Sequence, residues 1–312
     1  MNRISRVVLS LMTVLAGCDS SGESTESSQA SLGCTDGMLD SSVTHIDLGI
    51  EGLIRSYELH VPASYDGSQA FPLVMNFHGY TSNGTQQRGY TKMDETADAH
   101  DFIVAYPNGL DSSWNAGLCC GESAMSGVDD VGFTRAILDD LGARGCIDLS
   151  RVYATGMSNG GFMSHRLACE VSDRIAAIAP VSGVLGLEPS DCSPSRPVPM
   201  IQFHGTDDFL VPFEGGGLAG SMPVSDSMDF WAEQNGCIDE PEVTFEQGIV
   251  TCETRDACTD GASVTLCTVE GGGHCWPGEP CARIEGVNLG TATTDINAND
   301  AMWALFSTVS LQ

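Results

Sequence analysis

Positively charged residues are scarce in this chain. Of 312 residues, 13 are Lys or Arg and 42 are Asp or Glu, so the formal net charge is −29, and Lys92 is the sole lysine. Nucleic acids and anionic membranes are bound through clustered basic side chains, and the sequence has no such cluster. Nucleic acid is therefore excluded as a partner. An acidic surface poor in lysine stays soluble at high ionic strength, so we expect a saline habitat.

The N-terminus lacks an apolar run long enough to span a bilayer. Residues 7–16 are apolar but too short for a stable anchor, and with Arg3 and Arg6 before them they predict an export signal. Residues 15–18, Leu-Ala-Gly-Cys, resemble the lipobox of bacterial lipoproteins, in which the cysteine is lipidated. We therefore expect an exported protein that meets the membrane only through a lipid anchor at Cys18, facing the periplasm or the exterior. Ordinary cleavage and secretion is the alternative.

Composition divides the chain into three parts. Residues 1–18 are the export signal with its lipobox, and residues 19–42 are rich in Ser, Glu and Gly. Such a segment has too little apolar surface to offset its ordering entropy, so it predicts a flexible tether. The chain is 42% hydrophobic overall, and residues 43–312 are long enough to form one catalytic domain with a full core.

Cysteine is abundant. Of 13 cysteines, 12 remain once Cys18 is assigned to the lipid anchor, an even number that suits disulfides in an oxidising compartment. The adjacent Cys119 and Cys120 are expected to bond to two different partners. The expected local pairs are Cys252 with Cys258 and Cys275 with Cys281. A zinc site built from these last four cysteines and His274 lacks the close spacing of zinc ligands, so no metal is expected.

Residues 151–161, Arg-Val-Tyr-Ala-Thr-Gly-Met-Ser-Asn-Gly-Gly, are the central motif. A short β-rich run breaks at Gly156 and continues beyond Gly160 into the helical pattern of residues 162–169. Strand, sharp turn with Gly on both sides of a Ser, then helix is the nucleophile elbow of α/β-hydrolases. The turn holds the serine in a strained conformation with its hydroxyl exposed, and side chains two residues away would collide with the backbone. The motif therefore predicts Ser158 as a nucleophile.

Strands alternate with helices along the rest of the chain. Two alternating segments predict antiparallel edge strands at 43–48 and 56–61, and continuous apolar runs predict buried strands. The remaining predicted strands are 71–78, 102–106, 151–155, 175–182, 198–203 and 262–269. A loop is predicted at 81–89, and the predicted helices are 90–99, 129–141 with Asp129 as N-cap, 162–169, 226–234 and 297–309. This order predicts the α/β class, an α/β-hydrolase fold whose mostly parallel central sheet carries helices on both faces.

A serine nucleophile needs a base, usually His, that a carboxylate holds in the right tautomer. In α/β-hydrolases the chain order is Ser, then Asp or Glu, then His. His274 follows the last predicted core strand and is the expected base. Asp208 is the expected orienting carboxylate and Asp207 the alternative, while His204 is expected to shape the loop that carries them.

An oxyanion hole needs two backbone N–H donors. The expected donors are Asn159, directly after the nucleophile, and Tyr80, in the loop that follows residues 71–78. Trp276 and Trp114 are candidates to line the substrate cleft, since aromatic faces suit both apolar chains and aryl rings; packing within their loops is the alternative. This chemistry requires no cofactor, and no motif indicates one.

Together these motifs identify a family. Besides the elbow and residues 71–79, they are Trp-Asn at 114–115, Cys-Cys-Gly at 119–121, residues 128–133, residues 166–170, His-Gly-Thr-Asp-Asp at 204–208 and Gly-Gly-Gly-His-Cys-Trp-Pro-Gly at 271–278. The chain from residue 43 onward resembles the LpqC-like family of polyhydroxybutyrate depolymerases and feruloyl or acetyl-xylan esterases. The resemblance implies ester hydrolysis through an acyl-enzyme, with Ser158, Asp208 and His274 as the triad. Tyr80 departs from the family, whose members often carry a small residue or Cys there.

We therefore expect an exported serine ester hydrolase acting on poly(3-hydroxybutyrate)-type polyester or its oligomers. A feruloyl or acetyl-xylan esterase acting on plant polysaccharide is the alternative. A serine peptidase of related fold would need an extra domain to select peptides, for which the chain has no spare length. A surface-binding module without catalysis would be expected to have a damaged triad.

Overall fold

The computed structural model describes residues 39–41, 44–50, 52–217, 220–281, 283–284 and 286–312. The expected export signal, its lipobox residue Cys18 and all but the end of the expected tether lie outside these residues. Those assignments therefore stay predictions.

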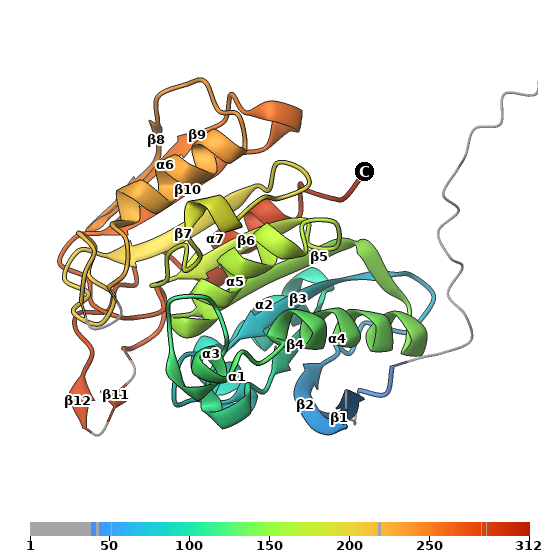
Figure 1. The fold of residues 1–312 in the computed structure, drawn as a ribbon. Coiled ribbons are helices and arrows are strands. Elements are labelled where there is room, and N and C mark those ends of the chain that lie inside the picture. The colour runs from blue at the N-terminus through green and yellow to red at the C-terminus, as the bar shows by residue number, and fades with distance from the viewer. Residues whose placement is uncertain (1–38, 42–43, 51, 218–219, 282, 285) are drawn as a thin grey trace, which may run out of the picture. The chain divides into compact units, whose positions relative to one another are not determined.

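Ten strands form one sheet (Figure 1). They are β1 (His45–Ile50), β2 (Leu53–His60), β3 (Phe71–Phe77), β4 (Ile103–Pro107), β5 (Ile147–Met157), β6 (Ala177–Val181), β7 (Met200–Gly205), β8 (Glu242–Gln247), β9 (Val250–Arg255) and β10 (Val264–Val269). Their spatial order is β1-β2-β4-β3-β5-β6-β7-β10-β9-β8. The central strands of this order, β4-β3-β5-β6-β7-β10, pair in parallel. Antiparallel strands flank them, β1 and β2 at one end and β9 and β8 at the other. A separate small hairpin joins β11 (Arg283–Ile284) to β12 (Val287–Asn288).

Seven α-helices are present in the described residues. They are α1 (Gly84–Thr91), α2 (Met93–His100), α3 (Gly121–Ser126), α4 (Asp130–Arg144), α5 (Asn159–Glu170), α6 (Val224–Gln234) and α7 (Ala298–Phe306). None of them has the length and apolar character needed to cross a membrane.

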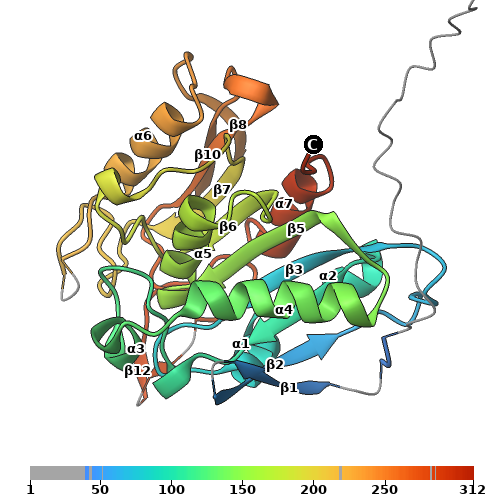
Figure 2. The same ribbon diagram turned by 45° about the vertical axis from the view of Figure 1, so that its right-hand side comes forward.

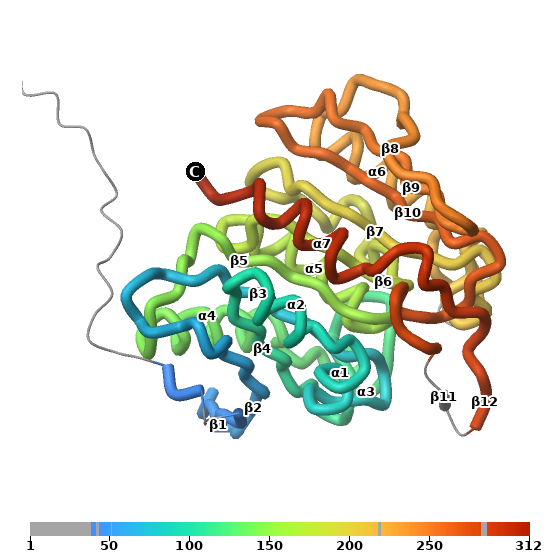
Figure 3. Tube along the Cα trace, turned by 180° about the vertical axis from the view of Figure 1, so that it is seen from behind, coloured from blue at the N-terminus to red at the C-terminus, as the bar shows by residue number. Residues whose placement is uncertain are grey.

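The helices cover both faces of the sheet. One apolar cluster joins α4, α5 and α6 to one face, and these helices lie in front of the sheet in Figures 1 and 2. A second cluster joins α2 and α7 to the opposite face, which Figure 3 shows from behind. Every residue of β3, β4, β6 and β7 is buried, as expected of parallel strands covered on both sides. The predicted α/β-hydrolase architecture is confirmed.

Some elements differ from the predictions. The helix predicted at 90–99 corresponds to α2 and the end of α1; α1 already begins at Gly84, and Lys92 separates the two helices because it adopts a left-handed conformation (φ 48°). Helix α3, the hairpin β11–β12 and the strands β8 and β9 were not predicted. Strand β8 has no buried residue, although Val243 and Phe245 alternate with polar residues in its sequence.

The disulfides correct two predictions. The bonded pairs are Cys119–Cys120, Cys169–Cys192, Cys237–Cys258, Cys252–Cys267 and Cys275–Cys281. The Cys275–Cys281 pair is confirmed. Pairing of Cys252 with Cys258 is wrong, because Cys252 and Cys267 lie opposite each other in neighbouring strands. Separate partners for the adjacent Cys119 and Cys120 are also wrong, since every other cysteine of the described residues is bonded elsewhere.

A buried ion pair ties strand β2 to helix α4. Arg55 Nη2 lies 2.7 Å from Asp130 Oδ1, and both side chains are buried. The guanidinium also lies over the ring of Phe133, 3.9 Å from its centre. Asp130 Oδ2 accepts a hydrogen bond from the N–H of Asn115 at 2.7 Å. Burial raises the pKa of the Asp130 carboxyl, although the Asn115 N–H and Arg55 act against this rise. The pair therefore anchors the segment that begins at Trp114 and leads towards the site described below.

Replacing Asp130 by Ala should lower the free energy of unfolding by about 3–5 kcal/mol, because it leaves the Arg55 guanidinium buried without a counter-ion. Urea denaturation measures this loss. The control is Asp139→Ala on the same helix, whose carboxylate is 70% exposed and pairs with Arg174. That change should cost less than about 1 kcal/mol. Equal losses in the two variants would contradict the role of the buried pair.

Candidate active site

Ser158 stands in a strained turn between β5 and α5. Its backbone has φ 56° and ψ −119°, a conformation that residues other than Gly rarely adopt. Its N–H donates to the Val181 carbonyl of β6 at 2.9 Å. A Cβ on Gly156 would lie 2.6 Å from the backbone of Phe77, and one on Gly160 only 2.1 Å from it. The glycines on both sides of the serine are therefore required by packing, as the motif predicted.

The Ser158 side chain is half-buried at the carboxyl edge of the sheet. The loop that follows β3 lies against it, since a Cβ on Gly79 would be 3.4 Å from the Ser158 Cβ. Within the described part of the chain, the Ser158 hydroxyl makes no hydrogen bond, and none joins it to His274. Catalytic hydrogen bonds are often long without substrate and tighten when substrate binds.

Asp208 and His274 are joined directly. His274 Nδ1 donates to Asp208 Oδ2 at 2.7 Å, and both side chains are buried. The other carboxylate oxygen accepts the N–H groups of Leu210 and Val211, each at 2.9 Å. Burial alone would raise the pKa of Asp208, but the hydrogen bond and the attraction of His274 hold it below its ordinary value. The carboxylate is therefore ionised, and His274 keeps its Nε2 for another partner.

The topology explains why residues so distant in sequence share one edge. Ser158 follows β5, Asp208 follows β7 and His274 follows β10, and these strands run parallel in neighbouring positions with β6 between the first two. The carboxyl ends of parallel strands lie at the same edge of the sheet, where α/β proteins place their sites (Figure 1).

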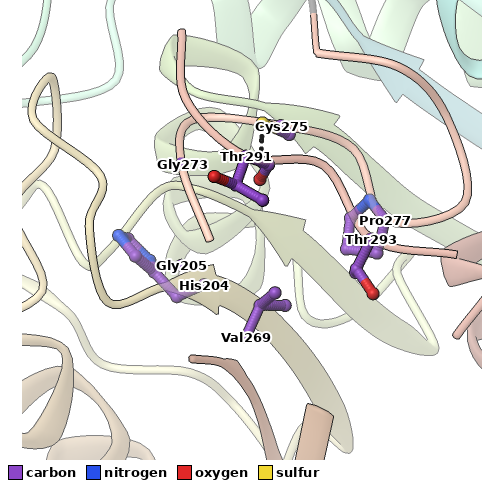
Figure 4. Close-up of a pocket in the computed structure, with 8 residues that line it drawn as sticks. All are labelled: His204, Gly205, Val269, Gly273, Cys275, Pro277, Thr291 and Thr293. Atoms are coloured by element: carbon purple, nitrogen blue, oxygen red, sulfur yellow. Dashed lines mark hydrogen bonds between the residues drawn. The ribbon is translucent and has the colours of Figure 1, made fainter. Parts of the chain in front are cut away.

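The loop that carries His274 is fastened to its surroundings. The N–H of Trp276 donates to the Tyr90 hydroxyl at 2.9 Å, and the disulfide Cys275–Cys281 closes the next turn. A cavity of about 10 Å³, whose lining residues are drawn in Figure 4, adjoins this loop and has room for no more than one water. It is lined by His204, Gly205, Val269, Gly273, Cys275, Pro277, Thr291 and Thr293. This cavity is therefore too small to be the ester pocket.

The backbone amides of Asn159 and Tyr80 are free to bind an anion. Neither donates a hydrogen bond to another group among the described residues. His78 shapes the Tyr80 loop: its Nε2 accepts the N–H of Gly109 at 2.9 Å, so its Nδ1 carries the proton donated to the Gly79 carbonyl at 2.7 Å. Burial lowers the pKa of His78 to about 4, which keeps this imidazole neutral and the loop fixed.

The side chain of Asn159 has a role that the sequence did not indicate. It is fully buried, its Oδ1 accepts the N–H of Trp114 at 2.7 Å, and its Nδ2 donates to the Cys119 carbonyl at 2.8 Å. The residue that follows the nucleophile therefore also fastens the segment from Trp114 to Cys119 against the elbow.

The two tryptophans do not line a cleft. Trp114 and Trp276 are both fully buried, and their indole N–H groups donate to the His78 carbonyl at 2.8 Å and to Asn299 Oδ1 at 3.0 Å. Their predicted role in binding substrate is wrong, because no ring face is open to a ligand. Packing within their loops, the alternative, is what the structure shows.

Exposed apolar side chains lie instead on the loops at this edge. They are Tyr80, 47% exposed, Leu118, 50% exposed, and Phe209, 54% exposed. Phe209 directly follows Asp208 in sequence, and Tyr80 is itself an expected oxyanion donor. These positions within or next to the site motifs were the sequence signal that could have indicated a role in binding substrate.

Residues 55–194 match the family described as esterase PHB depolymerase. Feruloyl esterase B of Piromyces equi is 33% identical over 234 residues, which are 70% of this chain and 42% of that enzyme. Feruloyl esterase C of Emericella nidulans is 29% identical over 189 residues, 59% of this chain and 63% of that one. The chain thus spans less than two thirds of the length of either relative.

Solved structures agree on the fold. The acetyl xylan esterase from Aspergillus awamori superposes with a TM-score of 0.59 at 15% identity, over 85% of this chain and 99% of that one. Residues 55–194, which are less than half of the chain, are thus similar to the esterase PHB depolymerase family, and the acetyl xylan esterase has the same fold.

Proposed function

We propose that the protein is a serine carboxylesterase that works through an acyl-enzyme. The observation that carries the proposal is the 2.7 Å hydrogen bond between His274 and Asp208, at the sheet edge where Ser158 stands in its strained turn. A buried, ionised carboxylate that fixes an imidazole tautomer, at the same sheet edge as a half-buried serine in a strained turn, is the arrangement that activates a hydroxyl. The relatives of the chain are esterases, which supports the same reaction class.

The reaction follows from these groups. The Ser158 oxygen attacks the ester carbonyl carbon while His274 Nε2 takes the hydroxyl proton, and Asp208 stabilises the imidazolium. The amides of Asn159 and Tyr80 bind the oxyanion that forms. The carbon–oxygen bond to the alcohol then breaks, and His274 returns its proton to the departing alcohol. A water molecule, deprotonated by His274, hydrolyses the acyl-enzyme and releases the acid.

The proposed substrate is a poly(3-hydroxybutyrate)-type polyester or its oligomers. The family description supports it, and so do the exposed apolar side chains of Tyr80, Leu118 and Phe209. Exposed apolar surface beside a site suits an aliphatic polyester chain, which offers few hydrogen-bond donors. The net charge of −29 also favours an uncharged substrate over an anionic one.

A second candidate is a feruloyl or acetyl ester of plant polysaccharide. The 33% identity to feruloyl esterase B over 234 residues favours it.

Hydroxybutyrate trimer and methyl ferulate, assayed in parallel, separate the two proposals. We expect kcat/KM to be higher for the trimer, and Phe209→Ser to lower the value for the trimer by about tenfold through lost apolar contact. A preference for methyl ferulate would make the aryl ester the substrate.

Export with a lipid anchor at Cys18 is also proposed. The disulfides of the described residues are consistent with an oxidising compartment outside the cytoplasm. We expect Cys18→Ala to move the full-length protein from the membrane fraction to the soluble fraction of expressing cells. An unchanged distribution between the two fractions would contradict lipidation at this residue.

The hydrogen bond of buried Asp208 to His274 supports Asp208 as the orienting carboxylate, whereas the side chain of Asp207 is exposed. Asp208→Asn should lower kcat for p-nitrophenyl esters by roughly 10⁴-fold, because the amide no longer holds the catalytic tautomer of His274. Asp207→Asn is the matched control and should keep turnover within a few-fold of the wild type. If Asp207→Asn lost activity and Asp208→Asn retained it, the assignment of Asp208 as the orienting carboxylate would be overturned.

A further inference from the structure

Four buried polar atoms on residues of β7 and α5 have no hydrogen-bond partner. Among the described residues, six buried side-chain nitrogen and oxygen atoms lack a partner, and four of them belong to His165, Gln202 and His204. These are His165 Nε2, both atoms of the Gln202 amide and His204 Nδ1. All three side chains are buried, with at most 1% of their surface exposed. Buried polar groups normally have partners, so this concentration calls for an explanation.

Geometry fixes the tautomer of His165. Its Nδ1 lies 2.9 Å from the indole Nε1 of Trp231, and an indole N–H can only donate. His165 Nδ1 is therefore the acceptor, and the ring proton is on Nε2. Burial lowers the pKa of His165 to about 3, so the ring is neutral; the Gly183 backbone and the Gln202 side chain act in the opposite direction, although Nε2 makes no hydrogen bond to either. His165 thus presents one N–H towards Gln202.

Geometry also fixes the tautomer of His204. Its Nε2 lies 2.8 Å from the carbonyl oxygen of Val211, which can only accept, so Nε2 carries the proton. Burial lowers the pKa of His204, which keeps this ring neutral as well. Its Nδ1 is therefore a lone-pair acceptor without a donor. The same Nε2 is 3.7 Å from Asp208 Oδ2, so His204 connects the other two residues of the cluster to the carboxylate.

Gln202 has the two groups that these imidazoles need. It precedes His204 by two residues in β7, and side chains two apart in a strand point to the same face. That face is the one covered by α5, which carries His165, and by α6, which carries Trp231. An amide offers an acceptor oxygen and a donor nitrogen. The oxygen suits the His165 N–H, and the nitrogen suits His204 Nδ1.

We propose that the Gln202 amide bridges His165 and His204 and that the resulting chain of hydrogen bonds positions the turn bearing Asp208. The chain runs in one direction: Trp231 Nε1–H to His165 Nδ1, His165 Nε2–H to Gln202 Oε1, Gln202 Nε2–H to His204 Nδ1, and His204 Nε2–H to the Val211 carbonyl. Each unpaired atom of the cluster then has a complementary partner.

The last bond of this chain explains how Gln202 can act on catalysis. Val211 closes the turn that follows Asp208, because its own N–H donates to Asp208 Oδ1. His204 holds the carbonyl of the same residue, so the orientation of Asp208 depends on the His204 tautomer. Gln202 and His204 are therefore positioning residues for the acid, and this inference rests on the proposed esterase function.

Nitrogen-15 NMR of the wild-type protein tests the tautomers directly. His165 and His204 should both show a protonated Nε2 and an unprotonated Nδ1, with His204 Nδ1 accepting a hydrogen bond from the Gln202 amide. The chain has seven histidines, so single His→Gln variants suffice to assign the signals. A protonated Nδ1 on either ring, or a His204 Nδ1 without a hydrogen bond, would overturn the proposal without any use of activity.

Kinetics test the consequence. Gln202→Leu keeps a similar volume but removes both bonds of the amide, and it should lower kcat for p-nitrophenyl esters about tenfold with KM unchanged, since supporting residues act through orientation. The control is Gln87→Leu, which removes another buried amide, one that donates to Asn76 Oδ1 at 2.8 Å. That variant should keep the wild-type kcat even though it loses stability.

Two results separate failure of this inference from failure of the proposed function. An inactive, folded wild type would refute the esterase, whereas the NMR result would still decide on the bridge. An active wild type together with equal kcat values for Gln202→Leu and Gln87→Leu would refute the positioning role. If Gln202→Leu does not fold, Gln202→Met provides a second apolar variant with the same expectation.

Discussion

The active site depends on one strained peptide turn. Ser158 keeps φ at 56° at a cost of about 1–3 kcal/mol, and the surrounding sheet supplies the constraint. Strand β6 accepts its N–H, and β3 lies so close that Gly156 and Gly160 have no room for a side chain. Close backbone packing thus surrounds the half-buried serine. A stable parallel sheet is what allows the serine to be strained.

The acid and base are placed by the same sheet but held by different means. Asp208 is fixed by backbone N–H groups and by His274, whereas the His274 loop is fixed by the Tyr90 hydroxyl and by a disulfide. On the buried side of Asp208, polar residues of β7 and α5 replace the apolar core. Buried polar groups are costly unless fully paired, but when fully paired they fix the orientation of their neighbours. Such groups suit a position where orientation matters more than stability. The loop that carries Tyr80, a proposed oxyanion donor, is held in a comparable way by the neutral His78.

Features encoded by local motifs could be predicted from the sequence. The elbow, the buried strands and the pairing of Asp208 with His274 follow from Gly spacing, apolar runs and chain order. Features that depend on the neighbours of a residue could not. Trp276 lies two residues after His274 and Trp114 lies in a polar, Gly-bearing loop, but the indole N–H of each finds an acceptor only in the folded core. Likewise, Cys252 pairs with Cys267 because β9 and β10 lie side by side, which sequence separation does not reveal.

The central claim is that Ser158 is the activated nucleophile, and covalent labelling tests it most directly. A fluorophosphonate reacts with a serine only where a base and an oxyanion site activate it. The wild-type protein should gain one phosphonyl group, located on Ser158 by tandem mass spectrometry, and a His274→Ala variant should gain none under the same conditions. Absence of the group from Ser158 in folded, oxidised protein, or its presence on another serine, would contradict the account.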